Sequence, residues 1–308
     1  MTDVEPPELP RGVALAWGVA AAPQRGPKRE MSIEKIVEAA VALADADGLG
    51  SVSMAAVAAK LGFTPMSLYR YVSAKDDLLL LMQEEATGIP PEAHREHTGW
   101  RARLRALFEA QALIFLRHPG ILSLPVAGTQ VTPNGSAWLD AALAALDGTP
   151  LDGQERLSVA LAVSGHARWY GMVLAGYAEQ SRTSGLSADE VSAREAEMFD
   201  RVIAADAFPH LRRAIDEGVF VAEGDPFRFA LERTFDGVEQ YIADLAGDGG
   251  ARRIETSWVE DETAEAADDK RVKEKAKAVA IAEKELREAR KVHRQAMREA
   301  REKAQRKG

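Results

Sequence analysis

Residues 64–75, which read Thr-Pro-Met-Ser-Leu-Tyr-Arg-Tyr-Val-Ser-Ala-Lys, decide the fold of this chain. Thr64 can accept a backbone N–H at a helix start, and Pro65 suits the first helical position because the amide hydrogen it lacks would have no partner there. The pattern therefore predicts a helix that begins at Pro65. The following side chains are polar, aromatic or long, whereas a core-facing helix this short would carry aliphatic residues. They suit a groove better than a core.

Two more helices are predicted just upstream. Apolar residues recur at spacings of three and four over residues 32–47, which is typical of an amphipathic helix, with Ser32 as its cap and Gly48 just past its end. Ser53 caps a second helix, and Gly62 ends it with a residue free to take the left-handed conformation that a tight turn demands. The order of these elements predicts a helix-turn-helix.

Residues 36–82 resemble the DNA-binding domain of the tetracycline-repressor (TetR) family of bacterial transcription regulators. The most specific parts of the match are residues 68–72, LYRYV, and residues 75–79, KDDLL. A lone helix-turn-helix is a loose pattern, but this whole succession is rarely accidental. The resemblance implies a DNA-binding domain at residues 25–88.

The resemblance also implies a role for each matching position. Arg70 is expected to read base edges, while hydroxyls and an ammonium group bond phosphate oxygens and fix the register. Tyr71 has an alternative role as a core residue that braces the helix. The positions expected to face the major groove are Thr64, Pro65, Met66, Ser67 and Arg70, and those expected to contact phosphate are Ser53, Tyr69, Tyr71 and Lys75.

A basic segment precedes the first of these helices. Arg25, Lys28 and Arg29 are split by Gly26-Pro27, which cannot be helical. These cations either reach phosphates or a minor groove from a flexible arm, or are simply solvated. Residues 1–24 contain four prolines and are predicted to be either a linker or a loosely packed extension in which Leu15 and Trp17 dock locally.

The net charge of −9 is unevenly distributed along the 308 residues. Residues 1–263 hold 24 Lys or Arg and 39 Asp or Glu, which gives −15, whereas residues 264–308 hold 15 and 9, which gives +6. Residues 24–75 hold seven basic and five acidic side chains, a net +2. Phosphate contacts supply much of the affinity of DNA-binding proteins, so affinity is expected to be modest per subunit and to depend on dimerisation.

The middle of the chain predicts helices only, because no run alternates with a period of two long enough for a strand. The fold class is therefore all-α. The strongest helical patterns are residues 100–118, 132–148, 154–181 and 226–246, and residues 183–224 hold shorter helical pieces. The family resemblance implies that residues 98–248 form an effector-binding domain that dimerises through a four-helix bundle, with 154–181 and 226–246 as the bundle helices. A two-fold dimer would read an inverted-repeat operator in double-stranded DNA.

The effector cannot be identified from the sequence, because such pockets are largely apolar with few polar anchors. Side chains at helical spacing are also core residues more often than pocket residues, and a histidine beside a proline is usually a satisfied or capping group. The candidates are Phe108, Phe115, Trp138, Trp169 and Tyr170 among the apolar side chains and Gln111, His118 and His166 among the polar ones.

Residues 264–308 differ from the rest and predict a long exposed helix. Val272, Val279 and Leu286 are seven residues apart, but His293 comes next, so a solvated helix is favoured over a coiled coil. The +6 charge leaves nucleic acid or an acidic partner open as its ligand.

Enzymatic and metal-binding functions find little support. The sequence has no cysteine, no phosphate loop, no Gly-x-Ser-x-Gly and no His-Glu-x-x-His, and only His94 and His97 lie close together. We expect no cofactor, no metal, no secretion signal and no membrane helix, and therefore a cytoplasmic protein. The sequence indicates a homodimeric transcription regulator, most simply a repressor released by an effector. The rival hypothesis is a helical interaction or scaffold protein that keeps the fold without reading DNA.

Overall fold

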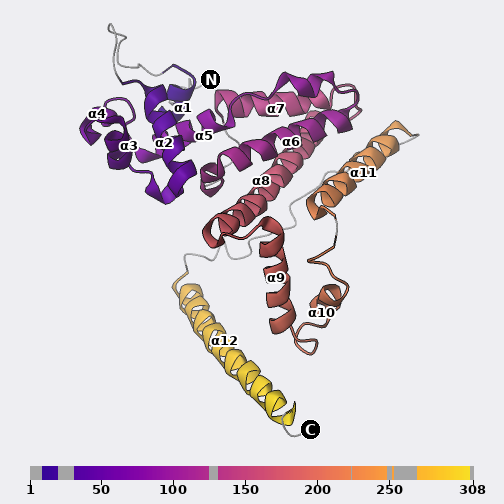
Figure 1. Ribbon diagram of the computed structural model, residues 1–308. Helices are drawn as coiled ribbons and strands as arrows, with labels where there is room; N and C mark the ends of the chain where they lie inside the picture. Colours follow the sequence, from indigo (N-terminus) through magenta and orange to yellow (C-terminus); the bar gives the residue numbers. More distant parts are fainter. Residues whose placement is uncertain are drawn as a thin grey trace. The chain divides into compact units, whose positions relative to one another are not determined.

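The computed structural model describes residues 9–19, 31–124, 131–222, 224–247, 252 and 269–305, and every regular element in these residues is helical. The predicted all-α fold class is confirmed. The chain divides into two units, residues 1–250 and 251–308, each described by itself (Figure 1). The elements are α1 (Arg11–Ala16), α2 (Ile33–Asp47), η1 (Leu49–Ser51), α3 (Met54–Leu61), α4 (Pro65–Tyr69), α5 (Lys75–Thr87), η2 (Glu92–Glu96), α6 (Trp100–Arg117), η3 (Pro119–Ser123), α7 (Pro133–Ala145), α8 (Gly153–Ser184), α9 (Ala188–Val202), α10 (Pro209–Asp216), α11 (Pro226–Ala246) and α12 (Lys270–Gln305).

The helices of the N-terminal part begin and end where local chemistry predicts. The Ser32 hydroxyl accepts a hydrogen bond from the Lys35 amide at 3.3 Å, and that of Ser53 accepts one from the Ala56 amide at 3.1 Å. Each bond satisfies one of the amides that a helix start leaves unpaired. Gly62 ends α3 in the left-handed conformation, with φ 76° and ψ 26°. The caps and the turn therefore follow from single residues.

A first hydrophobic core lies within α2, α3, α4 and α5. Ile36, Val57, Leu68 and Leu78 come from the four helices in turn, and none of them exposes any surface. Each fully buried side chain of this size contributes about 1.5–3 kcal/mol. This core fixes the position of the short α4.

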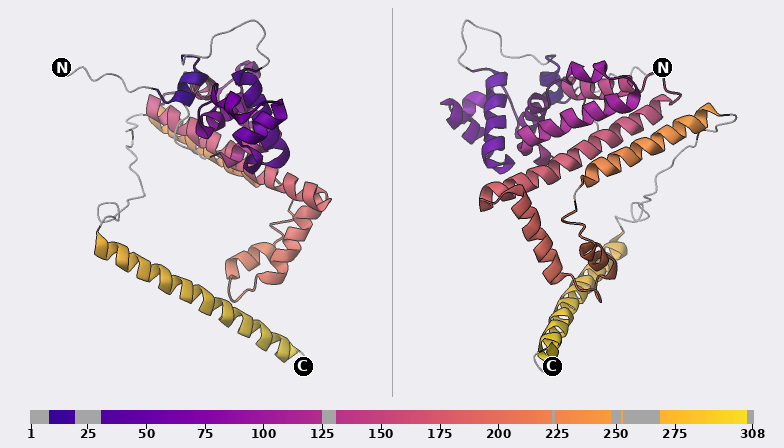
Figure 2. Two further views of the ribbon diagram at one scale, coloured as in Figure 1. Left: turned by 90° about the vertical axis from the view of Figure 1, so that its left-hand side faces the viewer. Right: turned by 45° about the vertical axis from the view of Figure 1, so that its right-hand side comes forward.

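A second core is formed by α6, α7, α8 and α11. The long α8 runs along α6, and α7 and α11 also pack against it (Figures 1 and 2). Leu104, Trp138, Ala167 and Phe235 come from α6, α7, α8 and α11 and are all buried. The helices predicted for residues 154–181 and 226–246 are thus present as α8 and α11, and both contribute to this core.

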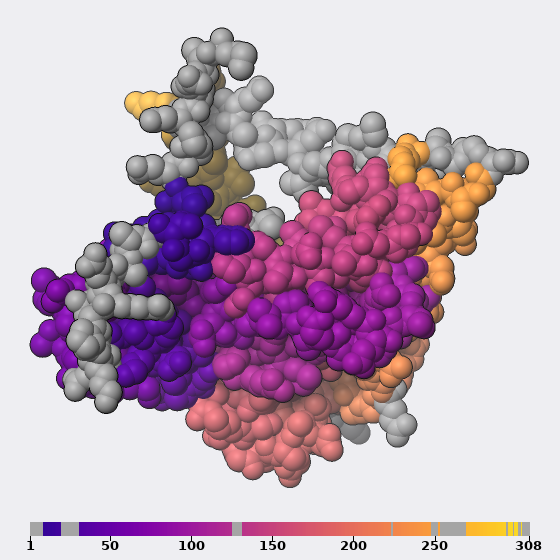
Figure 3. Space-filling model, turned by 90° about the horizontal axis from the view of Figure 1, so that it is seen from above, coloured from indigo at the N-terminus to yellow at the C-terminus, as the bar shows by residue number. Residues whose placement is uncertain are grey.

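The two cores share α6. Ile114 and Phe115 near its C-terminal end are partly buried against both cores. Gly171 of α8 allows a close approach here, because a Cβ on it would lie 2.5 Å from the Cβ of Phe115. In the space-filling view the surface of the N-terminal helices continues into that of α6 and α7 (Figure 3).

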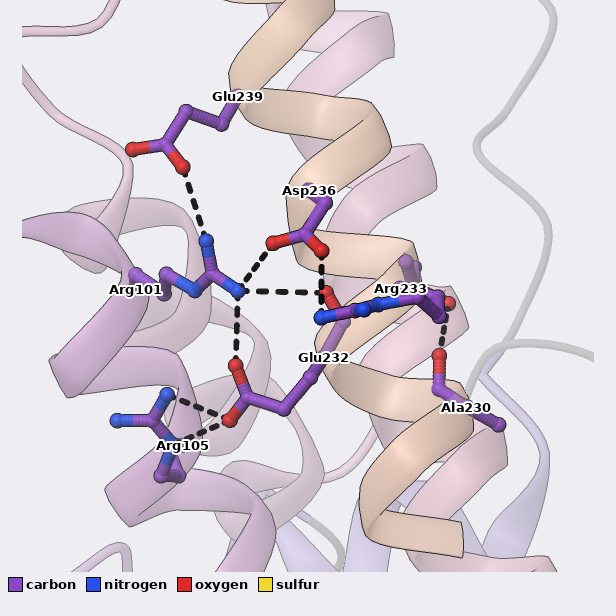
Figure 4. Close-up of polar contacts among 8 residues, drawn as sticks. Arg101, Arg105, Ala230, Glu232, Arg233, Asp236 and Glu239 are labelled. Atoms are coloured by element: carbon purple, nitrogen blue, oxygen red, sulfur yellow. Dashed lines mark hydrogen bonds and ion pairs between the residues drawn. The ribbon is translucent and has the colours of Figure 1, made fainter. Parts of the chain in front are cut away.

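An ion-pair network holds α11 against α6 (Figure 4). Arg101 donates to the carboxylates of Glu232 at 2.8 Å, Asp236 at 2.5 Å and Glu239 at 2.9 Å. Arg105 donates to the other oxygen of Glu232 at 2.5 Å. Burial acts to raise the pKa of Glu232, but the hydrogen bonds from both arginines outweigh it and leave the pKa below its ordinary value. The charged form of Glu232 therefore stabilises the fold.

The N-terminal extension contains a helix that sequence analysis missed. Residues 1–24 were expected to be an extension or linker, yet α1 lies within them and packs on α5. Gly12 is buried there. The two helices are so close at this point that a Cβ on Gly12 would lie 3.0 Å from a carboxylate oxygen of Asp77. The indole N–H of Trp17 donates to the Val131 carbonyl at 3.0 Å, beside the start of α7. This segment is therefore part of the folded unit.

The helices α9 and α10 follow α8 and match the predicted helical pieces of residues 183–224. A capping box starts α9, since Ser187 accepts from the Glu190 amide and Glu190 accepts from the Ser187 amide. The rings of Phe199 and Phe220 stack with centroids 4.4 Å apart.

In the second unit, α12 is a helix of 36 residues. Its start is defined by Asp269, whose carboxylate accepts from the amides of Arg271 at 2.8 Å and Val272 at 3.0 Å. Every side chain of α12 that the structure describes is exposed, as predicted for this tail.

The network of Figure 4 predicts the effect of one substitution. Glu232→Gln should lower the free energy of unfolding by about 1.5–3 kcal/mol near neutral pH, because two charge-assisted contacts are lost. The difference from wild type should shrink as the pH falls below 4.5, since the lowered pKa of Glu232 stabilises only the charged form. Urea unfolding at several pH values measures both effects.

The matched control is Arg95→Ala, because the ion pair of Arg95 with Glu92 has side chains that are 67% and 74% exposed. Its effect should stay under about 1 kcal/mol. Equal effects of the two substitutions would contradict a stabilising role for the network.

Candidate nucleic-acid interface and its link to the C-terminal domain

The α3–turn–α4 segment places a very short helix on the surface. The amide of Phe63 donates to the Ala58 carbonyl at 2.9 Å, which closes the turn after Gly62. Below α4, Leu68 and Val72 are completely buried in the first core. These two anchors turn the remaining side chains of α4 outward.

Most of the side chains predicted to contact DNA are exposed. Met66 is 75% exposed and Tyr69 is 44% exposed, although both are large apolar or aromatic groups whose exposure to water is unfavourable. Ser67 and Tyr71 are partly buried. The exposed positions are Ser53, Thr64, Pro65, Met66, Tyr69, Arg70 and Lys75.

Two details differ from the expectation. The Thr64 side chain makes no capping bond to α4, and instead the hydroxyl of Ser67 donates to the Thr64 carbonyl at 2.5 Å. Tyr71 packs against the first core, so the alternative of a bracing residue describes part of its role. Tyr71 is only partly buried and directly follows Arg70, so a role in DNA contact stays a prediction.

Ser53 and Lys60 share one side of α3. They are seven residues apart, which is two helical turns, and both are exposed. Ser53 already accepts the capping bond from Ala56, but its hydroxyl hydrogen can still be donated to a phosphate. Sequence analysis did not consider Lys60 as a candidate phosphate contact, although its spacing of seven residues from Ser53 could have suggested it. Arg25, Lys28 and Arg29 lie outside the described residues.

Direct contacts tie this domain to α6 and η3. A ring nitrogen of His118, at the end of α6, lies 2.7 Å from a carboxylate oxygen of Asp45 in α2. Gly120 in η3 packs on the last turns of α2, where an added Cβ would lie 2.7 Å from the Cβ of Ala44 and 2.9 Å from its backbone. One ring nitrogen of His118 is thus bonded to Asp45, which agrees with the alternative of a satisfied histidine, and its role in orienting an effector stays a prediction.

A second link joins α5 to α7. The carboxylate of Glu84 accepts from the Asn134 amide at 2.6 Å, and the side chain of Asn134 donates to the Glu84 carbonyl at 2.8 Å. The indole N–H of Trp138 donates to the Gly88 carbonyl at 3.0 Å. Trp138 is 5% exposed within the second core and joins α7 to the end of α5, while its place in an effector pocket stays a prediction.

The remaining effector candidates lie on α6 and α8. The rings of Phe108 and Tyr170 have centroids 5.7 Å apart, and the side-chain amide of Gln111 donates to Ser164 at 3.3 Å. Trp169 is 57% exposed, whereas Phe115 is partly buried between the two cores. These contacts bring Phe108 and Tyr170 together and leave Phe115 at the domain junction.

Phe227 of α11 completes the aromatic cluster and was missed by sequence analysis. Its ring centroid lies 4.9 Å from that of Trp169 and 5.2 Å from that of Tyr170. Burial and the nearby Asp225 carboxylate raise the pKa of Tyr170. Beside this cluster, Nε2 of His166 is buried without a hydrogen-bond partner, and the His166 ring lies 6.4 Å from that of Trp169. An unpartnered buried nitrogen favours a polar ligand atom nearby.

No group of three or more His, Cys, Asp or Glu side chains suited to a metal ion occurs among the described residues. None of the helices described here is both long enough and apolar enough to cross a membrane.

Comparison with known proteins identifies the same two regions. Residues 36–82 match the family model described as bacterial regulatory proteins, tetR family, and residues 92–242 match the tetracyclin repressor-like C-terminal domain.

The chain is 32% identical over 243 residues to the HTH-type transcriptional repressor DrrR1 of Streptomyces coeruleorubidus, covering 78% of this chain and 89% of that protein. It is 28% identical to an HTH-type transcriptional regulator of Saccharopolyspora erythraea, covering 70% and 85%. Among solved structures, the TetR family protein ActR of Streptomyces coelicolor in complex with actinorhodin matches with a TM-score of 0.54 at 20% identity, covering 72% of this chain and 99% of that one. This last likeness supports the fold.

The close packing of η3 on α2 predicts a large effect of one methyl group. Gly120→Ala should destabilise the protein by about 1–3 kcal/mol, because the new Cβ would overlap Ala44 and force the domains apart. Gly153→Ala in the first turn of α8 is the control, since a Cβ there meets nothing within 4 Å. Thermal unfolding of both variants measures the difference, and a Gly120→Ala protein as stable as the control would show that the contact is not tight.

Proposed function

Since the chain belongs to the TetR family of bacterial regulatory proteins, we propose that it is a cytoplasmic, homodimeric repressor released from an inverted-repeat operator by a small-molecule effector. The observation that carries this proposal is the exposed face of α4 above the buried Leu68 and Val72. Large side chains held outward on a fixed base are suited to a DNA groove.

The proposed DNA contacts divide into two kinds. Thr64, Pro65, Met66, Ser67 and Arg70 face base edges in the major groove. Ser53, Tyr69, Tyr71 and Lys75 hold phosphates and set the register, and Lys28 and Arg29 add backbone contacts from the preceding arm. Hydrogen bonds to bases carry the sequence information, while those to phosphate position the protein. The exposure of Arg70 and Lys75 supports this assignment.

The proposed dimer forms through α8 and α11, within a C-terminal domain of residues 98–248. Leu161, Gly165, Trp169, Met172 and Gly176 recur along α8 at helical spacing, and all five are exposed in the single chain. Two glycines in such a row let a second helix approach closely, and the three large apolar side chains would be buried by it. A two-fold dimer would place two copies of α4 about one DNA turn apart.

The proposed effector site is the aromatic cluster of α6, α8 and α11. Phe108, Tyr170 and Phe227 offer apolar ring surface, and the unpartnered Nε2 of His166 offers a polar anchor. Gln111 and Trp169 border this cluster. ActR, whose fold is similar, has been solved with (S)-DNPA and with actinorhodin, which supports a small-molecule ligand for this fold.

The proposed release works through the two links between domains. A ligand that fits the C-terminal domain better in an arrangement unsuited to DNA must weaken DNA binding by the same free energy by which DNA weakens ligand binding. The His118–Asp45 contact and the Glu84–Asn134 contact are rigid connections through which such a change would reach α2 and α5.

Selection of binding sites from random DNA with the purified protein tests the proposal. We expect a symmetric site with two equal half-sites. Failure to enrich any sequence would favour the rival hypothesis of a scaffold protein that keeps the fold without reading DNA.

Arg70→Ala and Lys75→Ala form a matched pair of tests, since each removes one exposed cation. Arg70→Ala should weaken binding to the selected operator by about 1–3 kcal/mol and relax the preference at one base step per half-site. Lys75→Ala should weaken binding to all sequences alike and reduce the salt slope by about one per subunit. Titrations on operator and random duplexes measure both, and the reverse pattern would exchange the two roles.

Gly165→Leu tests the proposed dimer face. A Cβ on Gly165 meets nothing within 4 Å in the single chain, so the folded subunit should tolerate leucine. Close approach of a partner helix should not, and sedimentation should shift from two subunits toward one. Gly153→Leu, equally open at the start of α8, should remain dimeric. A dimeric Gly165→Leu protein would place the interface elsewhere.

A further inference from the structure

Most of the cations of α12 fall on one side of the helix. Lys273, Lys277, Lys284, Arg287 and Lys291 follow one another at spacings of four, seven, three and four residues, and all are exposed. The same spacing continues in the sequence to positions 294, 298 and 301, all arginine, and the one position it skips, 280, is alanine. We call this row of eight cations the basic stripe.

The basic stripe keeps one sign over its whole length. Residues 270–305 contain 13 Lys or Arg and 6 Glu, a net +7, and no glutamate occupies a stripe position. A repeat of seven residues drifts by about 20° per heptad on a straight helix, so four heptads turn the stripe by only about a quarter of a turn. At about 1.5 Å per residue the stripe is about 42 Å long.

Apolar side chains do not form a comparable surface on α12. Val272, Val279, Leu286 and Met297 share one side, but Ile281 and Val292 fall on the opposite side, and the helix has no aromatic residue. A membrane-surface helix needs a continuous apolar face, usually with aromatic or leucine side chains. A coiled coil with a second copy would meet His293 at the next heptad position. Charge is therefore the property that α12 can use.

We infer that the basic stripe of α12 is a second, sequence-independent DNA-binding surface, which lies along the phosphate backbone of the duplex that the N-terminal domain binds. This inference rests on the proposed function, because DNA is the polyanion already bound by the same chain. Duplex DNA carries one negative charge about every 1.7 Å, and each phosphate neutralised by Lys or Arg releases counterions. Covalent linkage to a bound domain raises the local concentration of α12 near the same duplex.

The division of charge along the chain agrees with this assignment. Residues 1–263 carry −15, whereas the DNA-facing residues 24–75 carry only +2. A stripe of eight cations offers more phosphate contacts than the whole helix-turn-helix. It would therefore supply affinity without adding specificity.

Two full-length variants with equal charge separate a stripe from a general charge effect. The stripe variant carries Lys277→Gln, Lys284→Gln, Arg287→Gln and Lys291→Gln, and the control carries Arg271→Gln, Lys275→Gln, Arg290→Gln and Lys303→Gln. Both lower the net charge of residues 270–305 from +7 to +3. All eight side chains are exposed, and circular dichroism checks that the helix content is unchanged.

Binding to a random-sequence duplex is measured over a series of salt concentrations. The stripe variant should lose about tenfold or more in affinity at low salt, and its salt slope should fall by up to about 3.6 per chain, whereas the control should change much less. Both variants should select the same operator as the wild type. Equal losses in the two variants, or no loss in the stripe variant, would overturn the inference.

The same proteins are tested on vesicles of anionic phospholipid. Binding that depends on the stripe there, with random-DNA affinity unchanged, would assign α12 to a membrane surface and overturn the inference. Failure of the wild type to select any operator would instead contradict the proposed function. The random-duplex comparison remains decisive for the stripe in that case, because it needs no operator.

Discussion

The packing of α6 and η3 on α2 is the constraint on which the rest of the first unit depends. Gly120 rests on Ala44 with no room for a side chain, and His118 contacts Asp45 one residue further along α2. Ile114 and Phe115, one turn earlier, are partly buried against both cores. Close-packed interiors do not deform continuously, so a shift of α6 must move α2 as well or break this seam. The DNA-reading helix is therefore not mechanically independent of the C-terminal domain.

A transcription regulator does not need the polar catalytic groups that an enzyme needs. Its activity is a free-energy coupling between two binding sites, and no bond is made or broken. What the chain must provide is rigid connection, which comes from the Arg101 network between α6 and α11 and from Glu84 and Asn134 between α5 and α7. Such contacts leave the aromatic cluster available for the proposed effector and the α4 surface available for the proposed DNA contacts.

Sequence analysis succeeded where one residue determines one local feature. Ser32, Ser53 and Gly62 act within three or four residues of themselves, so the limits of α2 and α3 could be read directly. The cap at Thr64 could not, because in so short a helix the Ser67 hydroxyl bonds back to the Thr64 carbonyl.

Contacts between residues that are distant in sequence could not be predicted. His118 contacts Asp45 and Trp138 contacts Gly88, which are 73 and 50 residues away, and no local pattern indicates these partners. The helix α1 was missed for the same reason, because its fit to α5 depends on Gly12 meeting Asp77. The exposure of most predicted DNA contacts could be expected because periodicity and caps are local, whereas the proposed effector site draws on three helices at once.

Negative and positive charges are concentrated in different parts of the chain. An acidic body with −15 in residues 1–263 repels DNA everywhere except where cations are locally exposed, so it limits the orientations in which the protein can approach the duplex. Arg70 directly follows the five-residue α4, and Lys60 in α3 and Lys75 at the start of α5 add one charge each. With so small a basic surface, the proposed function requires affinity from two subunits acting together and from a basic element elsewhere in the chain. In the proposed arrangement the cations that read bases and those that add only affinity are on different helices, so the strength of binding could change without any change in the sequence that is recognised.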